Sequence, residues 1–187
     1  AMIWCRFPAI KSALNLRQFR DVQAVGGKQR TPAQYAQTLF DEGGAIVQLC
    51  DDMLLPAWDA HDWTEIFRPE HWRSGAMRIH VFGHALLEHA LTPNKLMTAK
   101  CLVWQGDPTG FDPIDATAAA IAEACWLTDP QELRPLPVSG IPGWHPNQDA
   151  DFYDGAACFR PVRAGRCYPS PLPAETYCAE KPARSCV

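Results

Sequence analysis

Apolar side chains near the start of the chain recur at the three- and four-residue intervals of a helix. In the segment 8–24 the recurring apolar positions are Ile10, Leu14, Phe19 and Val22. Lysine, arginine and aspartate fill positions between them, as on an amphipathic helix that buries one face. Pro8 suits the first turn of such a helix, and Gly26 and Gly27 follow its end. The pattern predicts a helix from Pro8 to about Ala24.

A second pattern occupies residues 37–50, QTLFDEGGAIVQLC. Two β-prone runs flank the polar pair Asp41 and Glu42 and two glycines. Because glycine supplies the positive φ that tight turns need, we predict a β-hairpin with its turn at this point.

The next stretch, DDMLLPAWDAHDWTEIFRPEHW, predicts two short helices. We expect Pro56 to interrupt the first and expect the second near Asp62 to Phe67. Asp51 and Asp62 are the candidate N-caps, because an aspartate side chain can accept hydrogen bonds from the first free amides of a helix.

Residues 77–91 fit two patterns at once. Apolar and polar residues alternate over 77–82, as on a half-buried strand, whereas helical spacing runs on to Leu91. We expect a helix from about Gly83 to Leu91 and leave 77–82 open. In the alternative, the helix begins near Ala76.

Two later segments complete the predicted core. TAKCLVWQ, residues 98–105, predicts a strand, and PIDATAAAIAEACWL, residues 113–127, predicts a helix because alanine is the best helix former. Together the elements predict an α+β fold, in which helices flank a small, mainly antiparallel sheet.

The composition changes from Pro130 onward: ten of the 17 prolines fall within the last 58 residues. Proline lacks a backbone donor and fixes φ, so we expect an irregular C-terminal region. We expect one globular domain over residues 1–161 and a mobile tail containing proline and cysteine over 162–187.

Composition narrows the classes of function. The net charge of −4 comes with scattered lysines and arginines, so no nucleic-acid partner is expected. No apolar run is long enough to cross a bilayer and no secretory signal opens the chain, so we expect a soluble, cytoplasmic protein without membrane insertion.

One charge asymmetry stands out near the C-terminus. Residues 141–156 contain three aspartates and no lysine or arginine. The segment that follows is basic and contains Arg160, Arg163, Arg166, Lys181 and Arg184. We expect the two segments to attract each other across the surface, although exposed ion pairs contribute little to stability.

Four longer matches accompany these patterns: AMIWCRFPAIKSALN, TLFDEGGAIV, FGHALLEHALTP and PLPVSGIPGWHPNQDADFYDGAACFRP. In this order, from residue 1 to about 161, the chain resembles the bacterial family catalogued as domain of unknown function 3025. The resemblance implies a compact intracellular domain and supplies no catalytic residue. It also implies that a segment upstream of residue 1 is missing, and that the last 25 or so residues belong to this chain alone.

The candidate chemistry centres on RIHVFGHALLEHALTP, residues 78–93. On a helix beginning near Gly83, His84 and Glu88 stand four residues apart on one flank. A carboxylate beside an imidazole suits a general base or a metal ligand. His84 and Glu88 are therefore the candidate catalytic pair, and His80, His84, Glu88 and Asp41 are the candidate ligands of a divalent metal ion.

A structural interpretation of the same residues is simpler. His84 and Glu88 could hydrogen-bond to each other at the edge of the core, as residues four apart on a helix commonly do. Asp41 could bond to turn amides. The spacing also differs from the His-Glu-x-x-His motif of zinc proteases, which disfavours protease chemistry.

A second candidate site lies in the aromatic-rich loop 141–159. Its run WHPNQDADFY combines rings with polar groups, and Trp144, His145, Asp149 and Tyr153 are its candidate binding residues. Tryptophan is prominent at interface hot spots, so the loop could contact a protein or a small molecule. The structural alternative is that its aromatic rings fold it onto the domain.

Two hypotheses of function follow. The first is a metal-dependent or acid-base enzyme that uses His84 and Glu88. The second is a non-catalytic module that binds a protein or ligand through loop 141–159.

Overall fold

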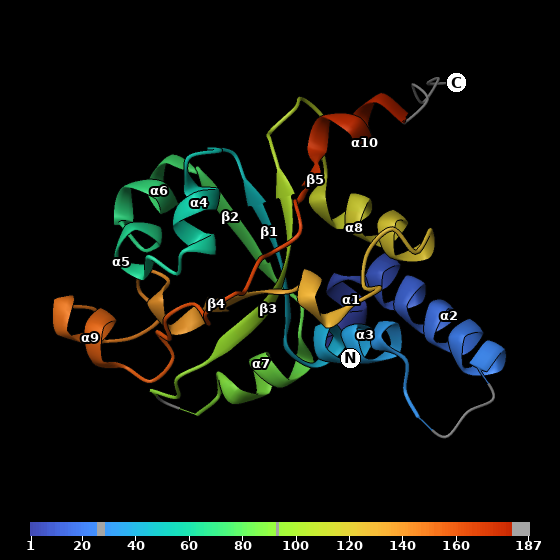
Figure 1. Cartoon of the computed structure of the whole chain (residues 1–187), viewed down its shortest axis with the longest axis horizontal. Helices are drawn as coiled ribbons and strands as arrows, with labels where there is room; N and C mark the ends of the chain where they lie inside the picture. The colour runs from blue at the N-terminus through green and yellow to red at the C-terminus, as the bar shows by residue number, and fades with distance from the viewer. Residues whose placement is uncertain (26–28, 93, 181–187) are drawn as a thin grey trace.

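The computed structural model describes residues 1–25, 29–92 and 94–180 of the chain (Figure 1). The α-helices are α1 Met2–Arg6, α2 Pro8–Val25, α3 Pro32–Gly43, α4 Leu54–Asp59, α5 Trp63–Ile66, α6 Pro69–Ser74, α7 His84–His89, α8 Pro113–Ala122, α9 Ala150–Gly155 and α10 Ala174–Glu180. The strands are β1 Gly44–Leu49, β2 Met77–Val81, β3 Thr98–Gln105, β4 Arg134–Pro137 and β5 Leu172–Pro173. Two 3-10 turns, η1 Pro130–Glu132 and η2 Val138–Gly140, flank β4. The predicted α+β class is confirmed.

In the described residues, five strands form one open sheet in the order β2-β1-β3-β4, with β5 pairing beside β3. β1 pairs antiparallel with β2 and parallel with β3. β3 then pairs antiparallel with β4 over its first half and parallel with β5 at its end. β3 therefore contacts three strands and organises the sheet.

Alternate residues of β1 and β3 face two apolar layers, because successive side chains of a strand point to opposite faces. Ile46, Leu102 and Trp104 pack with α1, α2, α3 and α8. Val47 and Val103 pack with the layer that α4, α5 and α6 form on the other side. Figure 1 shows these two groups of helices on opposite sides of the sheet.

The predicted helix at 8–24 is confirmed as α2, which packs against α8. Arg17 joins the two helices: its buried guanidinium donates to the carbonyl oxygens of Trp126 and Leu127 beyond the end of α8. Burial lowers the pKa of Arg17, and the charge of Asp21 opposes this effect. Gly26 and Gly27, expected at the helix end, lie outside the described residues.

The predicted hairpin at 37–50 is wrong, because α3 runs directly into β1. Thr31 and Gln34 form a capping box at the start of α3, and Pro32 occupies its first turn. Gly44 serves close packing, not a turn. A Cβ on Gly44 would lie 2.2 Å from the Phe40 carbonyl oxygen, so only glycine fits where the helix ends.

The segment 51–74 forms three short helices. Asp62 caps α5 by accepting from the Glu65 amide at 3.1 Å, which confirms one predicted N-cap. Pro56 lies in the first turn of α4 and does not interrupt it, because the amide that proline lacks is unpaired in a first turn anyway. The third helix, α6, was not predicted.

Residues 77–81, left open by their pattern, form β2. Their backbone groups pair with β1, where His80 lies opposite Ile46. The alternative of a helix beginning near Ala76 is therefore wrong, and His80 does not share a helix face with His84.

As far as residue 180, where the described part of the chain ends, the C-terminal region has only short elements, as its prolines predict. Residues 162–173 nevertheless run along the domain, and β5 adds to the sheet. No helix within the described ranges is both long and apolar enough to cross a membrane.

Candidate functional site

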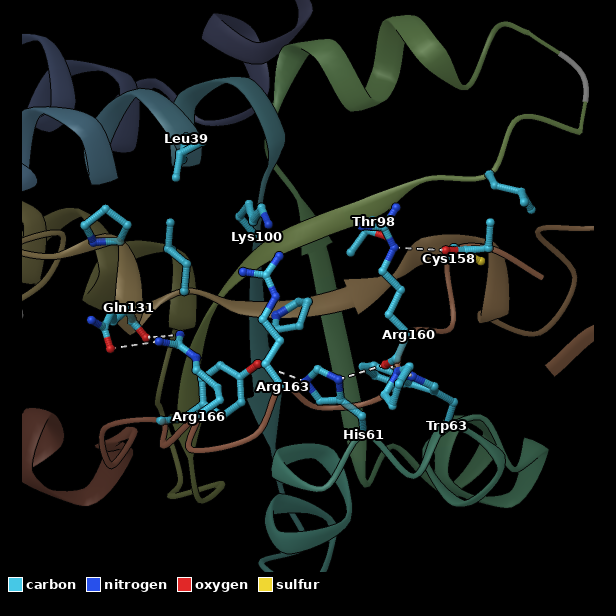
Figure 2. A pocket seen from close by; sticks show the side chains of 17 residues that line it. Leu39, His61, Trp63, Thr98, Lys100, Gln131, Cys158, Arg160, Arg163 and Arg166 are labelled. Carbon is cyan, nitrogen blue, oxygen red and sulfur yellow. Dashed lines mark hydrogen bonds between the residues drawn. The ribbon is translucent and has the colours of Figure 1, made fainter. Parts of the chain in front are cut away.

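A cavity of about 650 Å³ lies beside the edge strand β4. One wall comes from β3 and the η1–β4 segment, and a second from the turn between α4 and α5 (Figure 2). A third wall is the segment 157–169, which we call the arginine strap. Cavities of this size commonly bind small molecules, and here segments distant in sequence meet around one.

Four cationic side chains line the cavity: Lys100 of β3 and Arg160, Arg163 and Arg166 of the arginine strap. Figure 2 shows the Arg163 guanidinium reaching toward Lys100, with Arg160 on one side of this pair and Arg166 on the other. No aspartate or glutamate is among the described lining residues. Burial raises the pKa of the Cys158 thiol, so this wall residue adds no negative charge either. The cavity is therefore strongly positive, in a chain whose net charge is −4.

Most donors on these cations have no protein partner in the described part of the chain. Lys100 and Arg163 make no side-chain hydrogen bond or ion pair there, and Arg160 uses only Nε, 3.2 Å from the Ala157 carbonyl oxygen. Lys100 is half-buried, which removes part of its hydration. An anion in the cavity would supply the missing partners, since charge-assisted hydrogen bonds are the strong ones.

Arg166 is fixed at one end of the cavity. Its two terminal nitrogens donate to the side-chain and backbone oxygens of Gln131, at 2.9 and 2.7 Å. Its guanidinium also lies 4.3 Å from the centre of the Tyr168 ring. This arrangement holds the charge in place before any ligand arrives.

The arginine strap is tied to α5 through the Arg160 carbonyl oxygen. His61 Nδ1 lies 2.9 Å from this oxygen and Trp63 Nε1 lies 3.1 Å from it. A carbonyl oxygen only accepts, so His61 carries its proton on Nδ1. Its Nε2 lies 2.9 Å from the Tyr168 hydroxyl, so both ring nitrogens have a hydrogen-bond partner.

His61 also has an unusual backbone, with φ at +57°. Left-handed conformations of residues other than glycine are costly and persist only where the surroundings hold them. Here a tilted contact with the Trp63 ring, with ring centres 4.7 Å apart, and the two ring hydrogen bonds hold the residue.

Arg134 anchors the far end of the arginine strap. Its side chain is 3 % exposed and pairs with Asp59 through two bonds, at 2.7 and 3.1 Å. It also donates to the Pro169 carbonyl oxygen at 2.8 Å, and its guanidinium lies 5.1 Å from the Tyr168 ring centre. Arg134 is thus already paired and acts as a support of the cavity.

The structure brings two of the predicted catalytic or metal residues together, in an unexpected way. His84 Nδ1 donates to the backbone carbonyl oxygen of Asp41 at 2.9 Å. The Asp41 carboxylate turns instead to Lys11, with Nζ 2.6 Å from Oδ1. Both groups therefore already have partners within the fold.

Glu88 and His80 lie apart from this contact. Glu88 is exposed on α7, and no hydrogen bond between it and His84 occurs in the described structure. His80 is half-buried on β2, where burial lowers its pKa, the positive charge of Arg6 adds to the effect and Asp112 opposes it. No three potential metal ligands converge within residues 1–25, 29–92 and 94–180.

The predicted binding residues of loop 141–159 mostly make local contacts. Asp149 caps α9 by accepting from the Phe152 amide at 2.9 Å, and His145 stacks on the Phe152 ring. The Tyr153 hydroxyl donates to the Gly140 carbonyl oxygen at 3.2 Å. Trp144 is 44 % exposed and leaves an apolar surface on this loop.

The sequence did not single out the cavity residues as a site. In the sequence, these arginines indicate only a basic segment, which is expected to attract the aspartates before it. No such ion pair occurs between the described residues: Asp149 caps a helix, and the arginines line the cavity. The repeat of arginine at positions 160, 163 and 166 was the available signal. Lys181 and Arg184 lie outside the described residues.

Comparison with curated proteins and with solved structures found no match. The family model described as "Protein of unknown function (DUF3025)" matches residues 1–163. The matched part contains His61, Lys100, Arg160 and Arg163, and it ends before Arg166 and Tyr168. The chain belongs to the DUF3025 family of proteins of unknown function.

Proposed function

We propose that this domain binds a small anionic molecule in the cavity beside β4. The observation that carries the proposal is the gathering of Lys100, Arg160 and Arg163 without a carboxylate partner among the described residues. Lys100 is half-buried, and Arg160 and Arg163 are exposed beside it. Like charges close to one another repel, and an anion among them relieves that repulsion.

The walls suit a molecule with an apolar part beside its charge. Leu39, Leu96 and Leu133 line the cavity together with several prolines. Apolar walls with a few placed polar groups are typical of small-molecule sites. This binding role refines the second hypothesis from the sequence, since loop 141–159 contributes Ala157 and Cys158 to the same cavity. A cytoplasmic location belongs to the proposal too.

Titration calorimetry with citrate and pyrophosphate tests the proposal. We expect both anions to bind the unaltered protein and Arg163→Gln to weaken both by about tenfold or more, the effect of one lost charge-assisted hydrogen bond. Arg20→Gln is the matched control, because it removes the same charge from an exposed position of α2 away from the cavity. Equal affinities in Arg163→Gln and the unaltered protein, or no binding of either anion, would disprove the proposal.

The first hypothesis from the sequence, an enzyme using His84 and Glu88 with or without a divalent metal, stays a prediction. Its distinguishing test is elemental analysis of the purified protein. Stoichiometric metal that is lost in His84→Ala would support it, whereas metal-free protein with unchanged properties in His84→Ala would remove it.

A further inference from the structure

The cationic groups of the cavity do not surround a single point. Figure 2 shows Arg166 beside Gln131 at one end, Arg163 with Lys100 in the middle, and Arg160 beside Thr98 at the other end. Thr98 and Lys100 are two residues apart on β3, so they stand on the same face about 7 Å apart along the strand. The positive charges are therefore spread along the length of the cavity.

A row of charges selects a different ligand from a single charged pocket. One carboxylate or phosphate group could contact Lys100 and Arg163 but would leave Arg160 and Arg166 without an anion. A ligand that satisfies all four cations must carry negative charge at several points along its length. Guanidinium groups in particular match the oxygens of phosphate in a two-pronged contact.

From this arrangement we infer that the cavity takes a chain of linked phosphate groups, as in an inorganic oligophosphate or the phosphate part of a nucleoside polyphosphate. This inference rests on the proposed anion-binding function and names its ligand class. The central phosphate lies between Lys100 and Arg163, and the flanking phosphates extend toward Arg160 and toward Arg166.

The supports described above fit this assignment. The Arg160 backbone is held by His61 and Trp63, and the Arg166 guanidinium is held by Gln131. The main chain at the Arg160 end and the guanidinium at the Arg166 end are thus held by the fold, which favours a ligand of matching length over a single ion. The Thr98 side chain lines the Arg160 end, where a hydroxyl can donate to a phosphate oxygen.

The experiment is a length series, measured by titration calorimetry without metal ions and at constant ionic strength. Orthophosphate, pyrophosphate and tripolyphosphate are compared, with citrate as a multivalent anion that contains no phosphate. We expect affinity to rise by about tenfold or more with each added phosphate, since each engages a further cation. We also expect tripolyphosphate to bind at least about tenfold more tightly than citrate.

Two variants locate the chain in the cavity. Arg163→Gln should weaken orthophosphate and tripolyphosphate alike, because it alters the central position. Arg160→Gln should weaken tripolyphosphate by about tenfold and leave orthophosphate nearly unchanged. The Arg160 carbonyl, which holds the strap, is retained in this variant, and Arg20→Gln again serves as the charge control.

The outcomes separate the inference from the proposal on which it rests. If citrate binds as tightly as tripolyphosphate, or if affinity is flat across the length series, the cavity binds anions but the phosphate-chain assignment is overturned. If Arg160→Gln weakens every anion equally, the row of charges acts as one pocket and the assignment fails too. Absence of any binding that depends on Arg163 overturns both.

Discussion

The region around α7 and the cavity beside β4 both contain histidines and charged groups, but they differ in how those groups are paired. Near α7 the Asp41 carboxylate is bound to Lys11, and His84 donates to a backbone carbonyl. In the cavity, Lys100 and Arg163 have no anionic partner among the described residues. Paired groups complete a fold, whereas unpaired ones held in place by it are available to a ligand. Whether each charged group has a partner therefore distinguishes the two regions better than the types of residue that they contain.

The largest expected effect tests whether the fold really holds the cavity in place. Arg134→Met removes the bonds to Asp59 and to the Pro169 carbonyl oxygen and leaves a carboxylate without its partner. We expect the free energy of unfolding to fall by about 2–3 kcal/mol, below the usual cost for a fully buried pair because Asp59 is 34 % exposed. Urea denaturation measures this change. An unaltered stability would show that Arg134 does not anchor the arginine strap.

Two lysines provide the most direct contrast between the regions. Lys11→Met should lower the free energy of unfolding by about 1–2 kcal/mol, because it leaves the part-buried Asp41 carboxylate unpaired. Lys100→Met should raise it by up to about 1 kcal/mol in anion-free buffer, because it removes a half-buried charge that faces Arg163. Urea denaturation of both variants measures whether each change lowers or raises the free energy of unfolding. A loss of stability in Lys100→Met would contradict the view that this lysine is held for a ligand.

A smaller effect is expected at α7 itself. His84→Ala removes one exposed hydrogen bond to the Asp41 carbonyl oxygen, so the free energy of unfolding should fall by less than about 1 kcal/mol. Citrate and pyrophosphate should bind this variant as they bind the unaltered protein. A large loss of anion affinity in the same titration would show that the two regions are coupled.

The smallest effect concerns His80 and pH. Because burial lowers the pKa of His80 in the folded protein, the unfolded chain binds a proton more readily at this position. Stability should therefore fall as the pH drops below about 6.5, the ordinary histidine value, and be regained as it rises. Between pH 5 and pH 8, the free energy of unfolding of His80→Asn should depend less on pH than that of the unaltered protein. An identical profile would mean that His80 does not contribute.

Much of the fold follows from local patterns, and the failures have physical causes. The helix α2, the strand β3 and the cap at Asp62 follow from periodicity and from a capping side chain. The predicted hairpin is wrong because glycine at position 44 is typical of a turn. In the structure, Gly44 is needed because a Cβ there would collide with Phe40. Periodicity does not report such close approaches.

The candidate site could not be predicted in the same way. Its residues come from positions 61–63, 98–100, 131 and 160–168, which only the folded chain brings together. The sequence showed that arginines recur after residue 160, but not that Lys100 would face them. The His84 and Glu88 spacing, in contrast, was visible in sequence because both residues lie on one short helix.

The doubly held carbonyl of Arg160 also has a consequence for how quickly a ligand could be captured. With the peptide group fixed by two ring N–H donors, only side-chain torsions of the arginine are left to settle when a charge arrives. Little main-chain entropy is then lost at this residue on association, and no slow rearrangement of the main chain precedes it. Encounter would be governed by diffusion and by long-range attraction, and hence would slow as added salt shortens the reach of the field.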